Sequence, residues 1–310
     1  MHEASGTSHA KAILIGEHAV VYSQPAIALP ITTIRMQVTV TPRPQNEQLV
    51  QSAFFNGDIR QAKTTRFNGI ATLIRQLLVR FDAKTQGFKL NIISDLPPER
   101  GMGSSAATAI AVIRCFYAAF DEPLDHDTLL RWADVSEHII HGNPSGIDAA
   151  TCSAARPQWL IRGHEPRNIA QPQRGVIVIA DSGVQGQTGA AVAAVARLLA
   201  ANPEEQQHIT ALGQLTRKMA LALAEDDIEA IGSMMNAAQT HLQSLGVSSV
   251  RLDELISAAT KAGALGAKLT GSGMGGCILA LTANEQAARV VDRALLQAGA
   301  TQTWQYAFAG

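Results

Sequence analysis

The sequence predicts a two-domain α+β protein, and three observations lead to that prediction. The chain has 310 residues, which corresponds to two domains at about 150 residues each. Hydrophobic residues make up 46% of it, enough for a large apolar core without disulfides or structural metals. In the second half a strand precedes several helices and then a strand–strand–helix–strand series, which indicates an antiparallel sheet with helices on one side.

Local patterns place the elements of the first half. Four runs are rich in β-forming residues or alternate apolar with polar ones, and these expected strands cover 11–16, 26–34, 36–42 and 87–97. Three stretches carry apolar residues at helical spacing, and these expected helices cover 69–81, 104–120 and 127–140. Asp127 is available as the N-cap of the last helix. The polar stretch 44–65 is expected to be a loop.

The second half follows a polar, proline-containing stretch, 155–174, which marks a boundary between domains 1–165 and 166–310. Its expected strands cover 175–183, 267–271, 277–282 and 303–309. Its expected helices lie between Thr188 and Leu245, at 252–262 with Gly263 as a C-cap candidate, and at 284–298.

Charge and cysteine usage exclude several classes of protein. Lys and Arg number 25 against 26 Asp and Glu, a net charge of −1, whereas a nucleic-acid binder normally carries a basic surface. The apolar content excludes intrinsic disorder. Three widely spaced cysteines, no secretory signal and no apolar run near 20 residues indicate a cytoplasmic protein with reduced thiols and no membrane span.

The most informative segment is LPPERGMGSSAA at 96–107. An expected strand ends there. Gly101 and Gly103, just before an Ala-rich helix, permit positive φ angles and a close approach of the backbone to a ligand. The first N–H groups of a helix lack internal partners and lie at the positive end of its dipole, so the segment predicts a phosphate cradle. Ser104 and Ser105 would either cap the helix or reach a phosphate-bound Mg²⁺, and an ordinary capped helix remains the alternative.

A second glycine cluster, GSGMGG at 271–276, lies between two expected strands. It is interpreted either as a flexible hairpin or as a loop that packs against the phosphate loop or the substrate. Lys268 just before it is either a phosphate partner or a solvated strand residue.

Acidic and basic candidates lie elsewhere in the chain. Glu137 is near the end of the 127–140 helix, and a tight turn in HGNPSGIDAA presents Asp148, which otherwise caps the next segment. Lys11 is an isolated cation in an apolar strand, where a solvent-facing role is the alternative. His138 and His141 suit a structural role at a helix end better than a zinc site.

Three motifs in this order resemble those of the GHMP-type small-molecule kinases: Lys11–Pro30, PPERGMGSSAA at 97–107 and KLTGSGMGGCILAL at 268–281. Met102, Glu99-Arg100, Ser272 and Met274 depart from the usual residues but keep the glycine pattern. His18 directly after Glu17, together with 141–150, 181–192 and 239–255, is similar to the members that phosphorylate mevalonate.

The resemblance implies a two-domain fold, with an N-terminal ribosomal-protein-like α/β domain, a C-terminal ferredoxin-like domain and a site in the cleft between them. It implies transfer of the γ-phosphoryl group of ATP to the 5-hydroxyl of mevalonate, in isoprenoid precursor synthesis. Asp148 would be the base and Lys11 its partner. Mg²⁺ would be held by Ser105 (or Ser104) and Glu137.

The resemblance also implies the binding residues. Those expected to bind the nucleotide phosphates are Pro98, Gly101, Met102, Gly103, Ser104, Ser105 and Ala106. Those expected to bind the substrate are Glu17, His18, Thr188, Gly271 and Ser272. The expected partners are ATP, mevalonate and a second copy in a homodimer, the commonest assembly, but neither nucleic acid nor a membrane. The alternatives are a family member acting on phosphomevalonate, homoserine or a sugar, and a non-catalytic ligand sensor.

Overall fold

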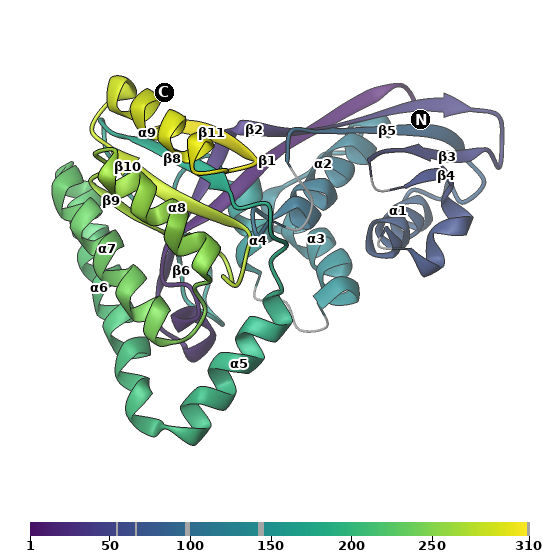
Figure 1. Cartoon of the computed structure of the whole chain (residues 1–310). Helices are drawn as coiled ribbons and strands as arrows, with labels where there is room; N and C mark the ends of the chain where they lie inside the picture. The colour runs from purple at the N-terminus through teal and green to yellow at the C-terminus, as the bar shows by residue number, and fades with distance from the viewer. Residues whose placement is uncertain (54, 66, 97–99, 142–145, 309–310) are drawn as a thin grey trace. The chain divides into compact units, whose positions relative to one another are not determined.

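The computed structural model describes residues 1–53, 55–65, 67–96, 100–141 and 146–308 (Figure 1). Its chain divides into two compact units. Unit 1 comprises Met1–Ala10, Ile34–Pro97 and Gly103–Ser153, and unit 2 comprises Lys11–Thr33, Pro98–Met102 and Ala154–Gly310. These units are not consecutive ranges such as 1–165 and 166–310, because the long strands β1 (Ala4–Ile15) and β2 (Ala26–Arg43) each contribute residues to both.

Unit 1 contains a mixed sheet built on the second part of β2. This part pairs antiparallel with β5 (Gly87–Ser94), with Met36 opposite Ser94 and Arg43 opposite Gly87. β3 (Gln48–Gln51) runs parallel to β5, and β4 (Asn56–Asp58) pairs antiparallel with β3.

Two expectations for this sheet are wrong. The expected strands 26–34 and 36–42 form a single strand, since Ile34, Met36, Val38 and Val40 continue one buried face. The expected loop 44–65 contains β3, β4 and the 3₁₀ helix η2 (Ile59–Thr64). Strands this short carry too few residues to show an alternating pattern.

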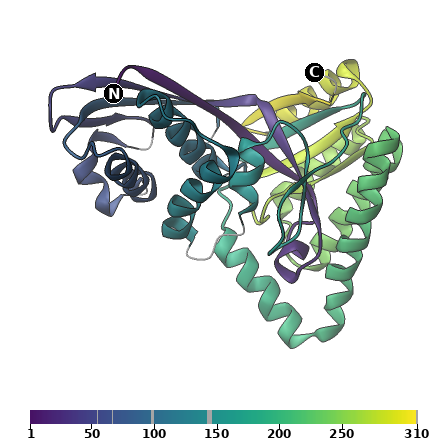
Figure 2. The ribbon, with the colours of Figure 1, turned by 180° about the vertical axis from the view of Figure 1, so that it is seen from behind.

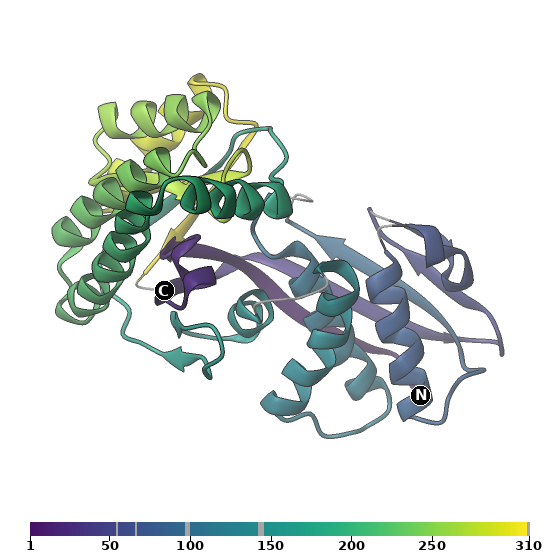
Figure 3. The same cartoon turned by 90° about the horizontal axis from the view of Figure 1, so that it is seen from below.

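The described part of unit 1 also contains the α-helices α1 (Asn68–Arg80), α2 (Ser104–Ala119), α3 (His126–His141) and α4 (Ile147–Ser153). The helices expected at 69–81, 104–120 and 127–140 are confirmed. α2 is the central one, packing against α1, α3 and α4 (Figure 3). The prediction of Asp127 as N-cap is wrong, because Asp125 Oδ1 accepts the N–H of Thr128 at 2.8 Å. α3 therefore begins one residue earlier than expected, with Asp127 in its first turn.

Unit 2 contains a four-stranded antiparallel sheet in the order β11-β8-β10-β9. The strands are β8 (Val176–Asp181), β9 (Gly266–Thr270), β10 (Cys277–Thr282) and β11 (Gln302–Ala307). The helices are α5 (Thr188–Ala201), α6 (Gln206–Glu225), α7 (Ile228–Ser244), α8 (Val250–Lys261) and α9 (Glu285–Gln297). α7 packs on β9, α8 on β9 and β10, and α9 on β8, β10 and β11 (Figure 2). The expected strand–helices–strand–strand–helix–strand order is confirmed.

Unit 2 also includes the first part of β2, which pairs antiparallel with β6 (Gln158–Leu160). β7 (Arg167–Asn168) pairs with β6, so short strands occupy the polar stretch 155–174. Two short 3₁₀ helices, η1 (Ala19–Tyr22) and η3 (Pro203–Glu205), complete the unit. No helix in the described part of the chain has the length and apolar character needed to cross a membrane.

All three cysteines, Cys115, Cys152 and Cys277, are buried thiols, as expected from their spacing. Burial raises the pKa of the Cys115 thiol to about 12. Burial also raises the pKa of the Cys277 thiol. Thiols protected in this way are poorly reactive, because the thiolate is the nucleophilic form.

Candidate active site

The start of α2 is shaped by its glycine and not by its serines. Gly103 is the N-cap, with a left-handed backbone at φ 76°, and no side chain caps the helix. The first intrahelical bond runs from the N–H of Ala107 to the carbonyl of Gly103 at 2.8 Å. The alternative of an ordinary helix capped by Ser104 or Ser105 is therefore wrong. An anion can take the place that a capping side chain would occupy at this positive helix end.

Two carboxylates of unit 1 lie on the helices that pack around α2. Glu137 is on α3 and is only 5% exposed. Asp148 lies in the first turn of α4 and is half-buried. Because α2, α3 and α4 all contact one another, Ser105, Glu137 and Asp148 come from one packed group of helices. The turn 142–145, expected to present Asp148, lies outside the described residues, as does Pro98.

No cluster of three or more His, Cys, Asp or Glu side chains suited to a metal occurs within the described ranges. Mg²⁺ does fit the residues present, because it takes one or two protein oxygens and completes its shell with phosphate and water. Ser105 and Glu137 are oxygen donors of that kind.

The two glycine segments meet in unit 2. A Cβ added to Gly271 would lie 3.4 Å from the carbonyl oxygen of Gly101, and one on Gly276 would lie 2.8 Å from that of Arg100. The N–H of Lys11 bonds to the carbonyl of Met102 at 3.0 Å. The interpretation of 271–276 as a loop packed against the phosphate loop is confirmed.

Arg100 anchors this loop to the sheet. Its Nε lies 2.9 Å from Asp181 Oδ2 at the end of β8, and both side chains are largely enclosed. Asp181 Oδ1 also accepts the N–H of Gly183 at 2.9 Å. Sequence reasoning missed this pair, although a lone Asp after the apolar run 176–180 and a lone Arg in a glycine loop are signals of buried partners.

Two lysines of unit 2 are buried. Lys11 is 3% exposed and Lys268 is fully buried, so the solvent-facing alternatives for both are wrong. Lys268 Nζ forms an ion pair with Glu17 Oε1 and donates to the carbonyl of Leu269 at 2.6 Å. Burial raises the pKa of Glu17, opposed by the charges of Lys268 and Lys11. Burial lowers the pKa of Lys268, opposed by Glu17.

His18, Thr188 and Ser272 come together around the hairpin loop. His18 Nε2 lies 2.9 Å from the carbonyl oxygen of Ser272, and since a carbonyl only accepts, Nε2 carries the proton. Burial lowers the pKa of His18, which favours the neutral ring and leaves Nδ1 as an acceptor. Thr188 Oγ1, at the start of α5, donates to Ser272 Oγ at 3.2 Å. Two of the expected substrate-binding residues, His18 and Thr188, thus contact a third, Ser272.

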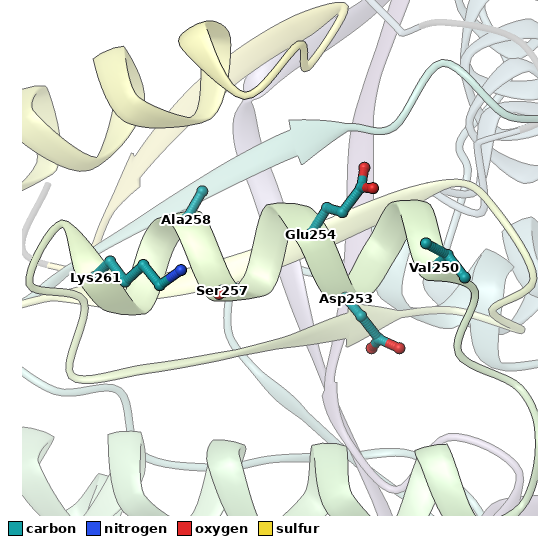
Figure 4. Close-up of a pocket in the computed structure, with 6 residues that line it drawn as sticks. All are labelled: Val250, Asp253, Glu254, Ser257, Ala258 and Lys261. Carbon is teal, nitrogen blue, oxygen red and sulfur yellow. The ribbon is translucent and has the colours of Figure 1, made fainter.

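A separate hollow lies on α8 (Figure 4). Its lining consists of Val250, Asp253, Glu254, Ser257, Ala258 and Lys261. All of them come from one helix, and Asp253 Oδ1 already accepts bonds from Gln239, Gln243 and Ser248. The hollow contains none of the expected site residues, and we assign it no role in binding substrate.

Comparison with known proteins places these features in a family. The models for the GHMP kinases N terminal domain and the GHMP kinases C terminal domain match residues 68–156 and 219–301. The mevalonate kinase of Aeropyrum pernix is 33% identical, over 90% of this chain and 88% of that protein. The mevalonate kinase of Pyrococcus furiosus is 32% identical, over 94% and 92%. The crystal structure of L. major mevalonate kinase in complex with R-mevalonate superimposes with a TM-score of 0.85 at 25% identity, covering 98% of this chain and 95% of that one.

Proposed function

The chain belongs to the mevalonate kinases of the GHMP kinase family, and from that premise we propose that it phosphorylates mevalonate with ATP. The γ-phosphoryl group passes to the 5-hydroxyl, giving 5-phosphomevalonate and ADP in isoprenoid precursor synthesis. The observation that carries the proposal is the match to curated mevalonate kinases at 32–33% identity over 90–94% of the chain. A galactokinase from Lactococcus lactis shares the fold at 18% identity, which gives no support to a sugar substrate.

We assign the proton transfer to Asp148. In phosphoryl transfer to an alcohol, a carboxylate accepts the hydroxyl proton as the oxygen attacks phosphorus. Asp148 has a defined position in the first turn of α4, where acidic side chains are stabilised by the helix dipole.

We assign the phosphates to the N–H groups at the start of α2. The absence of a side-chain cap at Gly103 supports this assignment. Ser105 and Glu137 would hold Mg²⁺, which neutralises phosphate charge when bound. Gly101 and Met102 continue the same loop in unit 2.

We assign charge stabilisation to Lys11 and substrate recognition to the group around Ser272. An ammonium group in a buried position stabilises negative charge that develops on the transferred phosphoryl group. His18 Nδ1 would accept a hydrogen bond from a hydroxyl of mevalonate, with Thr188, Gly271 and Ser272 beside it. The contacts of His18 and Thr188 with Ser272 support this grouping.

We also place the enzyme in the cytoplasm. Three buried cysteine thiols suit a reducing compartment. Fractionation of cells that produce the native chain would test this placement, and recovery from an oxidising compartment would contradict it.

The direct test is an ADP-release assay on the purified chain, with and without Mg²⁺. Mevalonate is compared with phosphomevalonate, homoserine and galactose. We expect turnover with mevalonate and Mg²⁺ at a kcat/KM well above that for the other three alcohols. Preference for any other alcohol would overturn the substrate assignment, and no turnover with any of them would favour a ligand sensor.

Asp148→Asn tests the chemistry within the same assay. We expect kcat to fall by about 10²-fold or more, the usual scale of general-base catalysis. Asp127→Asn is the matched control, because Asp127 is an exposed acid in the first turn of α3. A folded Asp148→Asn variant with normal kcat would remove Asp148 as the base.

A further inference from the structure

Arg100 and Asp181 form an enclosed ion pair that the proposed chemistry does not use. Arg100 Nε lies 2.9 Å from Asp181 Oδ2, and the two side chains are 17% and 5% exposed. Arg100 is also one of the residues by which the chain departs from the usual family motif. An ion pair taken out of water costs desolvation energy and rarely stabilises a fold by itself. A role in the site therefore explains the pair better than stability alone.

The carboxylate of Asp181 has one oxygen on each of two segments. Oδ2 accepts a hydrogen bond from Arg100, the first residue of the segment 100–102, whose glycine and methionine we assign to the nucleotide phosphates. Oδ1 accepts the N–H of Gly183 at 2.9 Å and so fixes the turn that leads to Thr188 at the start of α5. One carboxylate therefore holds a segment assigned to the nucleotide and a segment assigned to mevalonate.

Asp181 is itself held firmly at the end of β8. Its carbonyl accepts the N–H of Thr301 at 3.0 Å. The next residue, Ser182, donates its N–H to the carbonyl of Gly276 at 3.0 Å, and the N–H of Gly276 bonds to the carbonyl of Val184 at 2.8 Å. The carboxylate is thus a fixed point on the sheet, and it sets the position of the two segments that are bonded to it.

We propose that Arg100 and Asp181 are positioning residues for phosphoryl transfer. The Asp181 carboxylate places the nucleotide-binding segment 100–102 through Arg100, and it places the segment that carries Thr188 through Gly183. The inference rests on the proposed function, which assigns these segments to ATP and mevalonate. The two effects are separable, because loss of the guanidinium releases only the first segment and loss of the carboxylate releases both.

Arg100→Met tests the first effect. The measurement is the Kd of a non-hydrolysable ATP analogue with Mg²⁺, which needs no mevalonate. We expect this Kd to rise by about tenfold, the scale of one hydrogen bond to a charged group, and the Kd of mevalonate to stay within about threefold of wild type. Arg100→Lys keeps a charged donor, so both Kd values should stay within about threefold of wild type. Arg289→Met, which breaks an exposed pair with Glu285 on α9, is the matched control.

Asp181→Ala tests both effects together. It removes both acceptor oxygens, so we expect the Kd of the nucleotide analogue and the Kd of mevalonate each to rise by about tenfold. The double variant Arg100→Met/Asp181→Ala should bind the nucleotide no more weakly than either single variant, because the two residues act on it through one contact. Thermal unfolding and the binding stoichiometry give the folded fraction of each variant.

The outcomes separate this inference from the proposed function. A smaller folded fraction of Arg100→Met with an unchanged nucleotide Kd would reduce the pair to a structural contact and overturn the inference. Nucleotide binding as weak in Arg100→Lys as in Arg100→Met would overturn it too, as would equal losses of mevalonate binding in Arg100→Met and Asp181→Ala. If Asp181→Ala does not fold, the two Arg100 variants decide. A wild-type chain that binds the nucleotide but not mevalonate would overturn the proposed function, and the nucleotide Kd values would still decide the role of Arg100.

Discussion

The two glycine loops, 101–106 and 271–276, are similar in composition but use glycine for different physical reasons. In the first, Gly103 adopts a left-handed backbone and starts α2 without a side-chain cap. A Cβ on Gly101 would meet nothing nearer than 3.7 Å. In the second, a Cβ on Gly273 would lie 2.1 Å from the carbonyl oxygen of Val247. Conformation alone requires the first glycines, whereas the second loop requires glycine both for its positive φ and for the close packing of backbone.

This difference indicates that the two loops have different roles in the site. The first loop leaves N–H groups at a helix end for a ligand. The second has its polar groups engaged, with the N–H of Met274 bonded to Val247 at 2.7 Å and that of Gly276 to Val184 at 2.8 Å. It therefore serves as a rigid support. Substitution of Gly273 in the second loop should therefore act mainly on stability, and substitution of Ser105 at the start of α2 mainly on activity.

Gly273→Ala should have the largest effect. The new Cβ would collide with a backbone oxygen, which cannot move aside, and φ of 75° is strained for alanine. Overpacking and backbone strain together should lower the free energy of unfolding by about 2–5 kcal/mol. Urea denaturation measures it. Gly263→Ala is the matched control, with a similar φ of 96° and open space around it. Equal losses in the two variants would mean that packing against Val247 contributes nothing.

Ser105→Ala should have the next largest effect, and on activity only. Because no side chain caps α2, the free energy of unfolding should change by less than about 0.5 kcal/mol, whereas loss of a true cap costs about 1 kcal/mol. Loss of a Mg²⁺ ligand should lower kcat by about tenfold or more and raise the Mg²⁺ concentration needed for half-maximal rate. Ser104→Ala, measured alongside, shows which serine binds the ion. A loss of stability with normal kcat would restore the capping role.

Local pattern was sufficient to predict most elements but not the buried contacts. The Ala-rich run of α2 and the apolar run of β8 carry their own periodicity, so their positions follow from neighbouring residues. The burial of Lys268 does not, because its partner Glu17 is 251 residues away. A lysine in a strand predicts a solvent-exposed side chain. Only a carboxylate that is remote in sequence but adjacent in space would predict burial, and the sequence does not show that neighbour.

The site residues show the same limit. Motif resemblance indicated Lys11, His18, Thr188 and Ser272 separately, and only the structure shows that His18 and Thr188 meet at Ser272. Arg100 and Asp181 each suggest a buried partner, but only the structure shows that they pair with each other. Pairings between distant segments depend on tertiary structure, which local sequence does not encode.

Gly101→Ala should have a smaller effect than Gly273→Ala. Its φ of 76° is strained for alanine, but a Cβ would be in ordinary contact with the nearest atom, the carbonyl oxygen of Thr270 at 3.7 Å. The free energy of unfolding should fall by about 1–2 kcal/mol, from backbone strain alone. Urea denaturation beside Gly273→Ala tests this order. A loss as large as that of Gly273→Ala would remove the contrast between the two loops.

The smallest expected effect is a pH dependence that arises from His18, which contacts the second loop. Burial lowers the pKa of His18 below its usual 6.5, with Lys268 acting in the same direction and the bond to Ser272 opposing. The unfolded chain therefore binds more protons near pH 6.5, so the stability contributed by His18 is present above that pH and is lost as pH falls through it. The loss should be at most about 0.7 kcal/mol between pH 7 and 6.

His18→Gln isolates this contribution. Burial and the charge of His208 also lower the pKa of His241, so the wild-type pH dependence contains more than one histidine. The change in the free energy of unfolding from pH 7 to 6 is measured for wild type and for His18→Gln. Subtracting the two changes cancels the contributions of the other histidines and leaves that of His18. A variant whose stability falls with pH as steeply as that of wild type would show that His18 takes up its proton as readily in the folded chain as in the unfolded one. The contact of His18 with the second loop would then contribute nothing to the pH dependence, and the role of that loop as a support would rest on the backbone contacts of Gly273, Met274 and Gly276.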